Sequence, residues 1–163
     1  MGSDFTFTVD IDVAIPDFMD ASIPLQQIGE KVANEAQRNI RMQKTPDNIP
    51  FIELAKKTKR DKLREHAPYP KMALYRKGIM YNAIHAYKVT NNEIMVGVIS
   101  RGSPRRDLIA LIHQEQGVNQ YTRITRPFLG ISKTLQDWAT KRMERWLSER
   151  VQKAAHKYIN LKF

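Results

Sequence analysis

The chain has 163 residues, of which 42% are hydrophobic and 27% charged, and its formal net charge is +10. This composition excludes a disordered chain and is typical of a globular protein with its own core. The absence of cysteine excludes disulfides and thiolate metal sites, and the absence of a long apolar run predicts that the chain does not span a membrane.

Charge is distributed unevenly along the sequence. Residues 1–30 contain six acidic residues and no lysine or arginine, so a total of +10 leaves +16 for the rest of the chain. Between Lys56 and Lys77 there are nine basic and two acidic residues. Opposite charges in separate segments favour head-to-tail contacts between copies of a chain. The alternative is that both segments are solvated surfaces.

The N-terminal segment predicts a β-strand. Apolar residues occupy every second position from Phe5 to Ile15, and Pro16 ends the pattern. Strict alternation is typical of a strand with one buried face, so we expect a strand or arm over residues 1–16. Asp10 and Asp12 fall on the same side, and we interpret them as solvent-facing positions and not as a paired-carboxylate site.

A helix, a turn and a basic segment follow. Apolar residues recur at helical spacing from Ile23 to Met42, with a start signal at Ser22 and Pro24 and a stop at Thr45-Pro46. The proline-rich stretch 46–50 predicts a turn. We expect residues 43–73 to form a basic loop or arm, in which 53–66 are either a surface helix or a mobile segment that the prolines at 68 and 70 terminate.

The middle of the chain predicts a β-hairpin. Leu74 to Tyr81 is helical or turn-like, and two strands, 84–90 and 93–99, then flank Asn91-Asn92. Asparagine tolerates the positive φ angles of a tight two-residue turn.

Two further helices are predicted. Ser103 and Pro104 start a short helix over 104–116 that ends at Gly117, with Leu108, Ile109, Leu111 and Ile112 buried. Ser132 caps a long amphipathic helix over residues 132–158, with an apolar stripe of Leu135, Trp138, Ala139, Trp146, Leu147, Val151, Ala154 and Tyr158. Together the elements predict a single α+β domain over 1–163, in which a small antiparallel β-sheet packs against amphipathic helices.

The sequence offers no pattern of catalytic or metal-binding residues. The four histidines, at 66, 85, 113 and 156, are not spaced as metal ligands. The glycines are scattered singly, and no nucleophile elbow or phosphate-binding loop is present. We therefore expect no enzyme activity, no metal and no cofactor. We expect His113 and Gln114 instead to satisfy backbone groups near Gly117.

Five short motifs occur in a fixed order between Gln27 and Val151. They are Pro46-Asp47 with Pro50-Phe51 and Leu54; Leu74, Gly78 and Ile84; the strand at 94–99; Ile112, His113 and Gln114 with Gly117; and Arg126, Pro127, Phe128, Leu129 and Gly130. This ordered set resembles the phage virion morphogenesis (tail completion) family. The chain departs from the family pattern at Lys77, where Thr is usual, at Ala83, where Ser is usual, and at Glu115-Gln116-Gly117, where Phe-Gly is usual.

The last motif has a physical rationale of its own. Pro127 favours an extended Arg126, and Phe128 and Leu129 can plug the base of the fold. Arg126 either pairs with a neighbouring acid or carbonyl group or is exposed. Gly130 frees the backbone before the next helix.

The resemblance implies a structural assembly protein of a tailed phage or prophage. Such a protein would form a ring, most simply a hexamer, at the head-proximal end of the tail, and would contact the tail tube and the neck or connector proteins. It would be found in the virion, and in the host cytoplasm during assembly. The resemblance implies no membrane partner and at most nonspecific DNA contact.

The uneven charge indicates where copies would meet. The interface candidates are Asp10, Asp12, Asp17, Lys56, Lys57, Lys59, Arg60, Lys62 and Arg64. The alternative function is a basic nucleic-acid-binding protein, in which the basic stretch binds phosphates and nearby tyrosines stack on bases.

Overall fold

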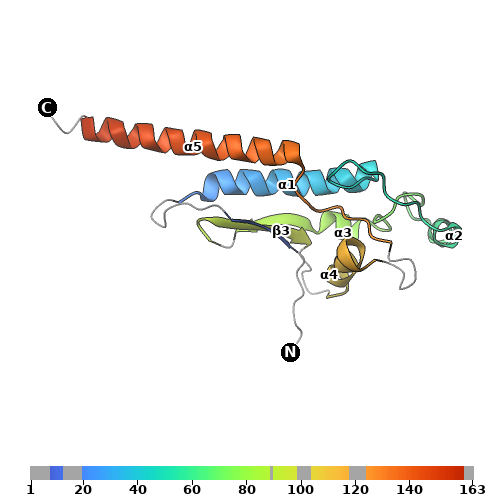
Figure 1. Ribbon diagram of the computed structural model, residues 1–163. Coiled ribbons are helices and arrows are strands. Elements are labelled where there is room, and N and C mark those ends of the chain that lie inside the picture. Colours follow the sequence, from blue (N-terminus) through green and yellow to red (C-terminus); the bar gives the residue numbers. More distant parts are fainter. Residues whose placement is uncertain (1–7, 13–19, 89, 99–103, 118–123, 160–163) are drawn as a thin grey trace. The chain divides into compact units, whose positions relative to one another are not determined.

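The computed structural model describes residues 8–12, 20–88, 90–98, 104–117 and 124–159 (Figure 1). The chain divides into two compact units, residues 1–130 and residues 131–163. That the two units form one domain stays a prediction. The elements are β1 (Thr8–Asp12), α1 (Ser22–Met42), α2 (Lys56–Arg64), α3 (Ile79–Asn82), β2 (Ile84–Lys88), β3 (Glu93–Val98), α4 (Pro104–Leu111), the π-helix η1 (Ile112–Gln116) and α5 (Lys133–Ile159). They confirm the predicted α+β fold.

Unit 1 is built on a three-stranded antiparallel sheet with the order β1-β3-β2. β2 and β3 form the predicted hairpin, and the N-terminal strand completes the sheet along the other side of β3. Val96 of β3 pairs with Val9 of β1 and with Ala86 of β2. The alternating apolar residues of the N-terminal segment thus join the middle of the chain through a contact between segments distant in sequence.

The hairpin turn differs from the prediction. The connection runs over residues 89–92, and neither Asn91 nor Asn92 is among the described residues with a positive φ. The Thr90 hydroxyl donates a hydrogen bond to Oδ1 of Asn92 (2.6 Å), and the Asn92 N–H donates to the same hydroxyl oxygen (3.4 Å). These side-chain contacts, together with the hydrogen bond from the Thr90 N–H to the carbonyl of Glu93 (3.4 Å), close the connection without left-handed backbone at the two asparagines.

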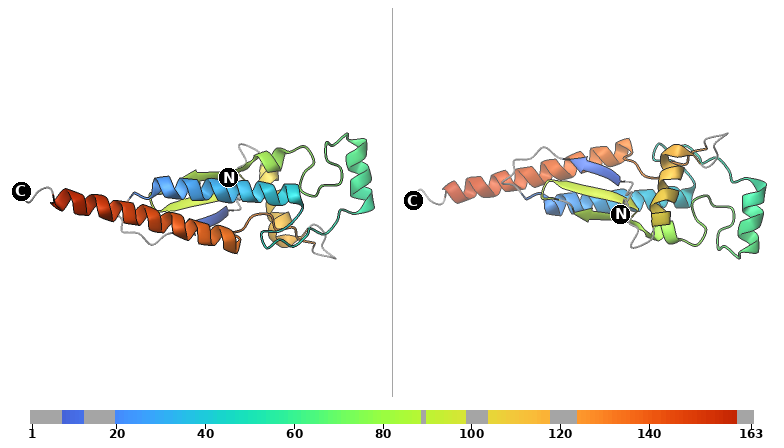
Figure 2. Two further views of the ribbon diagram at one scale, coloured as in Figure 1. Left: turned by 90° about the horizontal axis from the view of Figure 1, so that it is seen from above. Right: turned by 90° about the horizontal axis from the view of Figure 1, so that it is seen from below.

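The core of unit 1 lies between α1 and one face of the sheet (Figures 1 and 2). Leu25, Ile28 and Val32 of α1 are buried, as are Ile94 and Val96 of β3. The helical spacing of apolar residues in 23–42 therefore predicted the buried face correctly, because one side of the helix packs on the sheet.

The ends of α1 are set by other residues than those predicted. The Ser22 side chain does not cap the helix; the Ser22 N–H instead donates to Oδ1 of Asp20 (2.9 Å). The helix ends before Thr45, because Gln43 adopts a left-handed conformation with φ of 54°. The predicted turn follows, with the Thr45 N–H bonded to the carbonyl of Ile49 (2.8 Å).

The basic segment contains a helix, so of the two interpretations offered for residues 53–66 the helix is confirmed. α2 begins at Lys56 and ends at Arg64. Its end is not set by Pro68 or Pro70, because His66 already takes a left-handed conformation with φ of 53°. In Figures 1 and 2, α2 lies at one end of unit 1, away from the sheet.

The predicted helix over 104–116 is present, but its second half is a π-helix. The N–H of Gly117 bonds to the carbonyl of Ile112 (2.7 Å), and Gly117 ends the helix with a φ of 80°. The predicted burial was wrong for Leu108 and Ile109, whose exposed fractions are 50% and 41%. Ala110 between them is the buried residue, so the inner face is rotated relative to the predicted one. The predicted cap Ser103 lies outside the described residues.

Unit 2 is dominated by α5. The Ser132 hydroxyl accepts a hydrogen bond from the N–H of Leu135 (3.2 Å), as its predicted cap requires. Over 27 residues the helix extends about 40 Å. Leu135, Met143 and Trp146 are buried. The predicted stripe fails in its later part, because Val151 is 61% exposed and Ala154 is also exposed.

Candidate functional site

Gln114 joins the two most distinctive motifs of the sequence. Its Oε1 accepts hydrogen bonds from the N–H groups of Phe128 (3.0 Å) and Leu129 (3.2 Å), and its Nε2 donates to the carbonyl of Leu129 (2.7 Å). One amide side chain of η1 thereby satisfies three main-chain groups of the Arg126–Gly130 segment. Gln114 does bind main-chain groups, but they belong to Phe128 and Leu129 and not, as we expected, to the turn at Gly117.

Among the residues that the structure describes, Arg126 contacts carbonyl groups and forms no ion pair with an acid. Its side chain is 4% exposed, its Nε donates to the carbonyl of Ile52 (2.9 Å), and its Nη2 donates to the carbonyl of Glu53 (3.3 Å). Its main-chain N–H bonds to the carbonyl of His113 (2.6 Å). Arg126 therefore ties η1 to the segment that enters α2, and burial lowers its pKa.

Phe128 is the plug that the sequence predicted. Its side chain is fully buried, and its carbonyl accepts a hydrogen bond from Nδ2 of Asn39 on α1 (3.2 Å). Leu129 beside it is also buried. At Gly130, a Cβ atom would lie 2.9 Å from Cγ of Pro46, so the chain passes too close to the first turn for a larger residue.

His113 differs from the expectation. Its Nδ1 atom is buried and has no hydrogen-bond partner among the described residues. Burial, together with the smaller effect of the positive charges on Arg126 and Lys62, lowers the pKa of His113 to about 4. The ring is therefore neutral near pH 7, and its neighbours are two buried cations.

Lys62 is the second buried cation. It was predicted as an interface residue, but its side chain is 5% exposed and donates to the carbonyls of Met72 (2.5 Å) and Tyr75 (2.7 Å). Burial lowers its pKa, as do the charges of Arg76 and Arg126. Lys62 therefore fastens α2 to the segment that follows it and does not contribute to an exposed surface.

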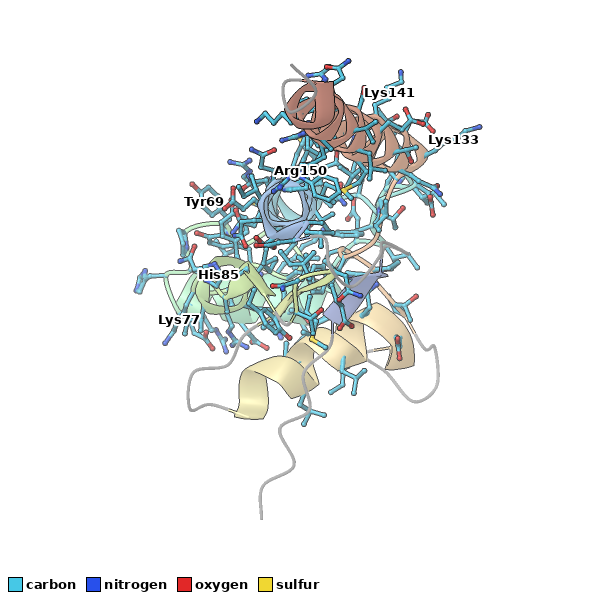
Figure 3. The ribbon with its side chains drawn as sticks, turned by 90° about the vertical axis from the view of Figure 1, so that its left-hand side faces the viewer. Tyr69, Lys77, His85, Lys133, Lys141 and Arg150 are labelled. Carbon is cyan, nitrogen blue, oxygen red and sulfur yellow. The ribbon has the colours of Figure 1, made fainter. Side chains whose placement is uncertain are left out.

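The other predicted basic residues lie on the outside of α2. Lys56, Lys57, Arg60 and Arg64 are exposed, and Lys59 forms an ion pair with Glu53 (2.6 Å). The hydrogen bond from Lys59, together with its charge, holds the pKa of Glu53 below its usual value. Arg76 lowers the pKa of Glu65 in the same way, through two hydrogen bonds to its carboxylate. Figure 3 shows Tyr69 and Lys77 at the surface of the same unit.

The box Leu74, Gly78 and Ile84 shapes the segment after α2. Leu74 has a φ of 62° and Gly78 a φ of 73°, and a Cβ on Gly78 would lie 2.9 Å from the hydroxyl of Tyr75. Ile84 is buried at the start of β2. Gln43 holds this segment by bonding to both the N–H (2.6 Å) and the carbonyl (3.1 Å) of Ala73.

Two of these anchoring residues were missed by reasoning from the sequence. Asn39 falls on the apolar face of α1, and a polar residue in that position signals a buried hydrogen bond. Gln43 gave no comparable signal, because its partner lies 30 residues away in the chain.

The acidic interface candidates are not brought together with the basic ones. Asp10 and Asp12 lie in β1, paired with Met95 and Glu93 of β3. Asp17 lies outside the described residues. No metal-binding group of three or more His, Cys, Asp or Glu residues occurs in the parts of the chain that the structure describes. Among the same residues, no helix is long and apolar enough to cross a membrane.

Comparison with known proteins gives one result. No curated protein and no solved structure matches the chain. The sequence does match the phage virion morphogenesis family, and the match runs over residues 12–148. It includes α1, α2, the hairpin, η1 and the Arg126–Gly130 segment, and it confirms the resemblance drawn from the five motifs. The chain therefore belongs to the phage virion morphogenesis family.

Proposed function

We propose that this protein completes the phage tail, as a ring at the head-proximal end that allows the head and the tail to join. Family membership gives it a structural role in phage assembly, and the match over residues 12–148 is the observation that carries the proposal. The protein acts through surfaces and not through an active site. It is found in the virion, and in the host cytoplasm while the virion is assembled.

The geometry of the signature motifs supports a scaffold role. Gln114, Arg126 and Asn39 direct their side-chain hydrogen bonds to main-chain groups of their own fold. They hold the segment between η1 and α5 in a fixed path, which leaves the outer surfaces available for partners. We propose the tail tube, the neck or connector proteins and further copies of the chain as those partners, with six copies to match the symmetry of a tail.

Deletion of the gene tests this proposal. We expect lysates of the deletion strain, imaged by negative-stain electron microscopy, to contain DNA-filled heads separate from tails. Overlong tails among them would identify a tail terminator, and tails of normal length would identify a neck component. Expression of the protein in trans should restore joined particles, which is the control for effects on neighbouring genes. Normal particles in the deletion strain would contradict the proposal.

A further inference from the structure

We infer that the outer face of α2 is the docking surface for the acidic N-terminal segment, residues 1–30, of a second copy of this chain. The inference rests on the proposed function and specifies one contact within the proposed ring. The outer face consists of Lys56, Lys57, Arg60 and Arg64 together with the exposed apolar residue Leu63.

The charge on this face is not neutralised within the described chain. Lys56, Lys57, Arg60 and Arg64 are exposed, and no described carboxylate lies within ion-pair distance of any of them. The acids on either side of the helix are already engaged, Glu53 with Lys59 and Glu65 with Arg76. The four cations follow one another at helical spacing and therefore form a continuous strip.

Apolar residues beside the cations favour a protein partner over nucleic acid. Leu63 on α2 is 60% exposed, and Ile52 just before the helix is 58% exposed. Phosphate contacts make no use of aliphatic side chains, and single-stranded nucleic acid stacks on aromatic rings. An acidic protein segment pairs its carboxylates with the cations and can cover an aliphatic side chain beside them.

The face is held in place before any partner arrives. Lys62, on the opposite side of the helix, is buried and donates to the carbonyls of Met72 and Tyr75. Arg76 fixes the end of the helix through Glu65. Because these contacts already order α2, docking does not have to supply the free energy of ordering it.

The N-terminal segment has the complementary chemistry. It contains six acidic residues and no basic residue, so its charge is opposite to that of the α2 face. Within one molecule, β1 lies in the sheet and α2 lies at the end of unit 1 away from it (Figures 1 and 2). We therefore place the contact between copies, because two different surfaces that meet in this way generate a ring when the rotation closes.

Charge reversal tests the contact. We expect the triple variant Lys57→Glu, Arg60→Glu, Arg64→Glu to weaken self-association by about tenfold or more in sedimentation velocity, because attraction becomes repulsion. The matched control is Lys133→Glu, Lys141→Glu, Arg145→Glu, which makes the same charge change at exposed positions of α5. We expect the control to associate like the wild type. Circular dichroism establishes that both variants are folded.

Charge reversal in the N-terminal segment tests whether this segment, and not another partner, binds the outer face of α2. By itself, the triple variant Asp10→Lys, Asp12→Lys, Asp17→Lys should weaken self-association. When it is combined with the α2 variant, we expect self-association to be restored, because the two charges are again opposite. Joined-particle yield in the complemented deletion strain gives the same comparison if the isolated wild type sediments as a monomer. Failure of the combined variant to recover, or an α2 variant that behaves like the control in both assays, would overturn the inference.

A DNA-binding assay tests whether the outer face of α2 binds nucleic acid instead of a second copy of the chain. With a 30-base-pair duplex as probe, we expect the α2 variant and the α5 control to bind equally weakly. Selective loss of duplex binding by the α2 variant, with self-association intact, would show a DNA surface and overturn the inference. The proposed function would fail separately, through normal particles in the deletion strain.

Discussion

Gln114 serves three buried main-chain groups, and its loss isolates all three. Phe128 and Leu129 are both buried, so water does not readily replace the lost hydrogen bonds. We expect Gln114→Leu to lower the free energy of unfolding by about 2–4 kcal/mol in urea denaturation. The adjacent exposed residue provides the control, since Glu115→Ala should change stability by no more than about 0.5 kcal/mol. Equal effects of the two substitutions would show that the three hydrogen bonds of Gln114 do not contribute to the free energy of unfolding.

His113 makes stability depend on pH. Its pKa is about 4 in the folded protein and 6.5 in the unfolded chain, so the unfolded chain binds the proton more tightly. The contribution of the neutral His113 ring to the free energy of unfolding is therefore complete above pH 6.5. It declines as the pH falls and is absent below about pH 4. It amounts to roughly 3 kcal/mol.

The measurement compares the wild type with His113→Gln, which removes the titrating group. We expect the difference between their free energies of unfolding to change between pH 6.5 and 4, with the wild type losing more stability. A difference that is constant across this range would show that His113 titrates in the same way in both states.

At the scale of elements, the packing of α1 on the sheet depends on Gly29. A Cβ there would lie 2.7 Å from Cδ1 of Ile94 and 2.9 Å from Cβ of Ala86. We expect Gly29→Ala to lower the free energy of unfolding by about 1–3 kcal/mol, because the clash outweighs the better helix propensity of alanine. Ile94→Val removes the nearer methyl group and so relieves the clash. We therefore expect Ile94→Val to lower the free energy of unfolding less in the Gly29→Ala background than in the wild type.

The exposed position Asn34 provides the matched control in α1. Asn34→Ala also improves helix propensity but meets no neighbour across the sheet, so we expect it to leave stability unchanged or slightly raised. If Gly29→Ala raised stability as well, the close approach of α1 to the hairpin would not constrain this position.

The elements that could be predicted from the sequence include those that pack against a single other element, because their apolar residues then lie on one face. α1 meets the sheet along one face, so the spacing from Leu25 to Ile40 marks that face directly. The hairpin and the cap of α5 at Ser132 could be predicted for a different reason, because residues adjacent in the sequence determine both.

The errors arise where distant segments decide the outcome. Lys62 looks like one more surface cation in the sequence, and only the carbonyls of Met72 and Tyr75 make its burial favourable. Leu108 and Ile109 carry a core-like pattern yet are exposed, because α4 turns Ala110 inward. Reasoning from the sequence thus found the motifs of the candidate site, but it did not find the anchors Asn39 and Gln43 that connect those motifs to α1 and to its C-terminal end.

At the scale of the whole molecule, the separation of charge predicts how copies associate. In the contact that we propose, the acidic N-terminal segment and the basic outer face of α2 attract each other electrostatically, and salt screens this attraction. We expect self-association, measured by sedimentation velocity, to weaken steadily as NaCl rises from about 50 to about 500 mM. Association that strengthens over this range would indicate an interface dominated by apolar contacts such as those available to Leu108, Ile109 or Val151.

The π-helix at Ile112–Gln116 has a further consequence for how the chain is compared with its family. In the family pattern that this sequence resembles, one residue separates Gln and Gly, whereas this chain has two, Glu115 and Gln116. The wider hydrogen-bonded ring from Gly117 to Ile112 accommodates one residue more than an α-helical ring. We therefore expect the additional residue to be held inside this helical turn. An alignment of relatives should place its gap within this helical turn, where Gln114 and Gly117 keep their roles on either side of it.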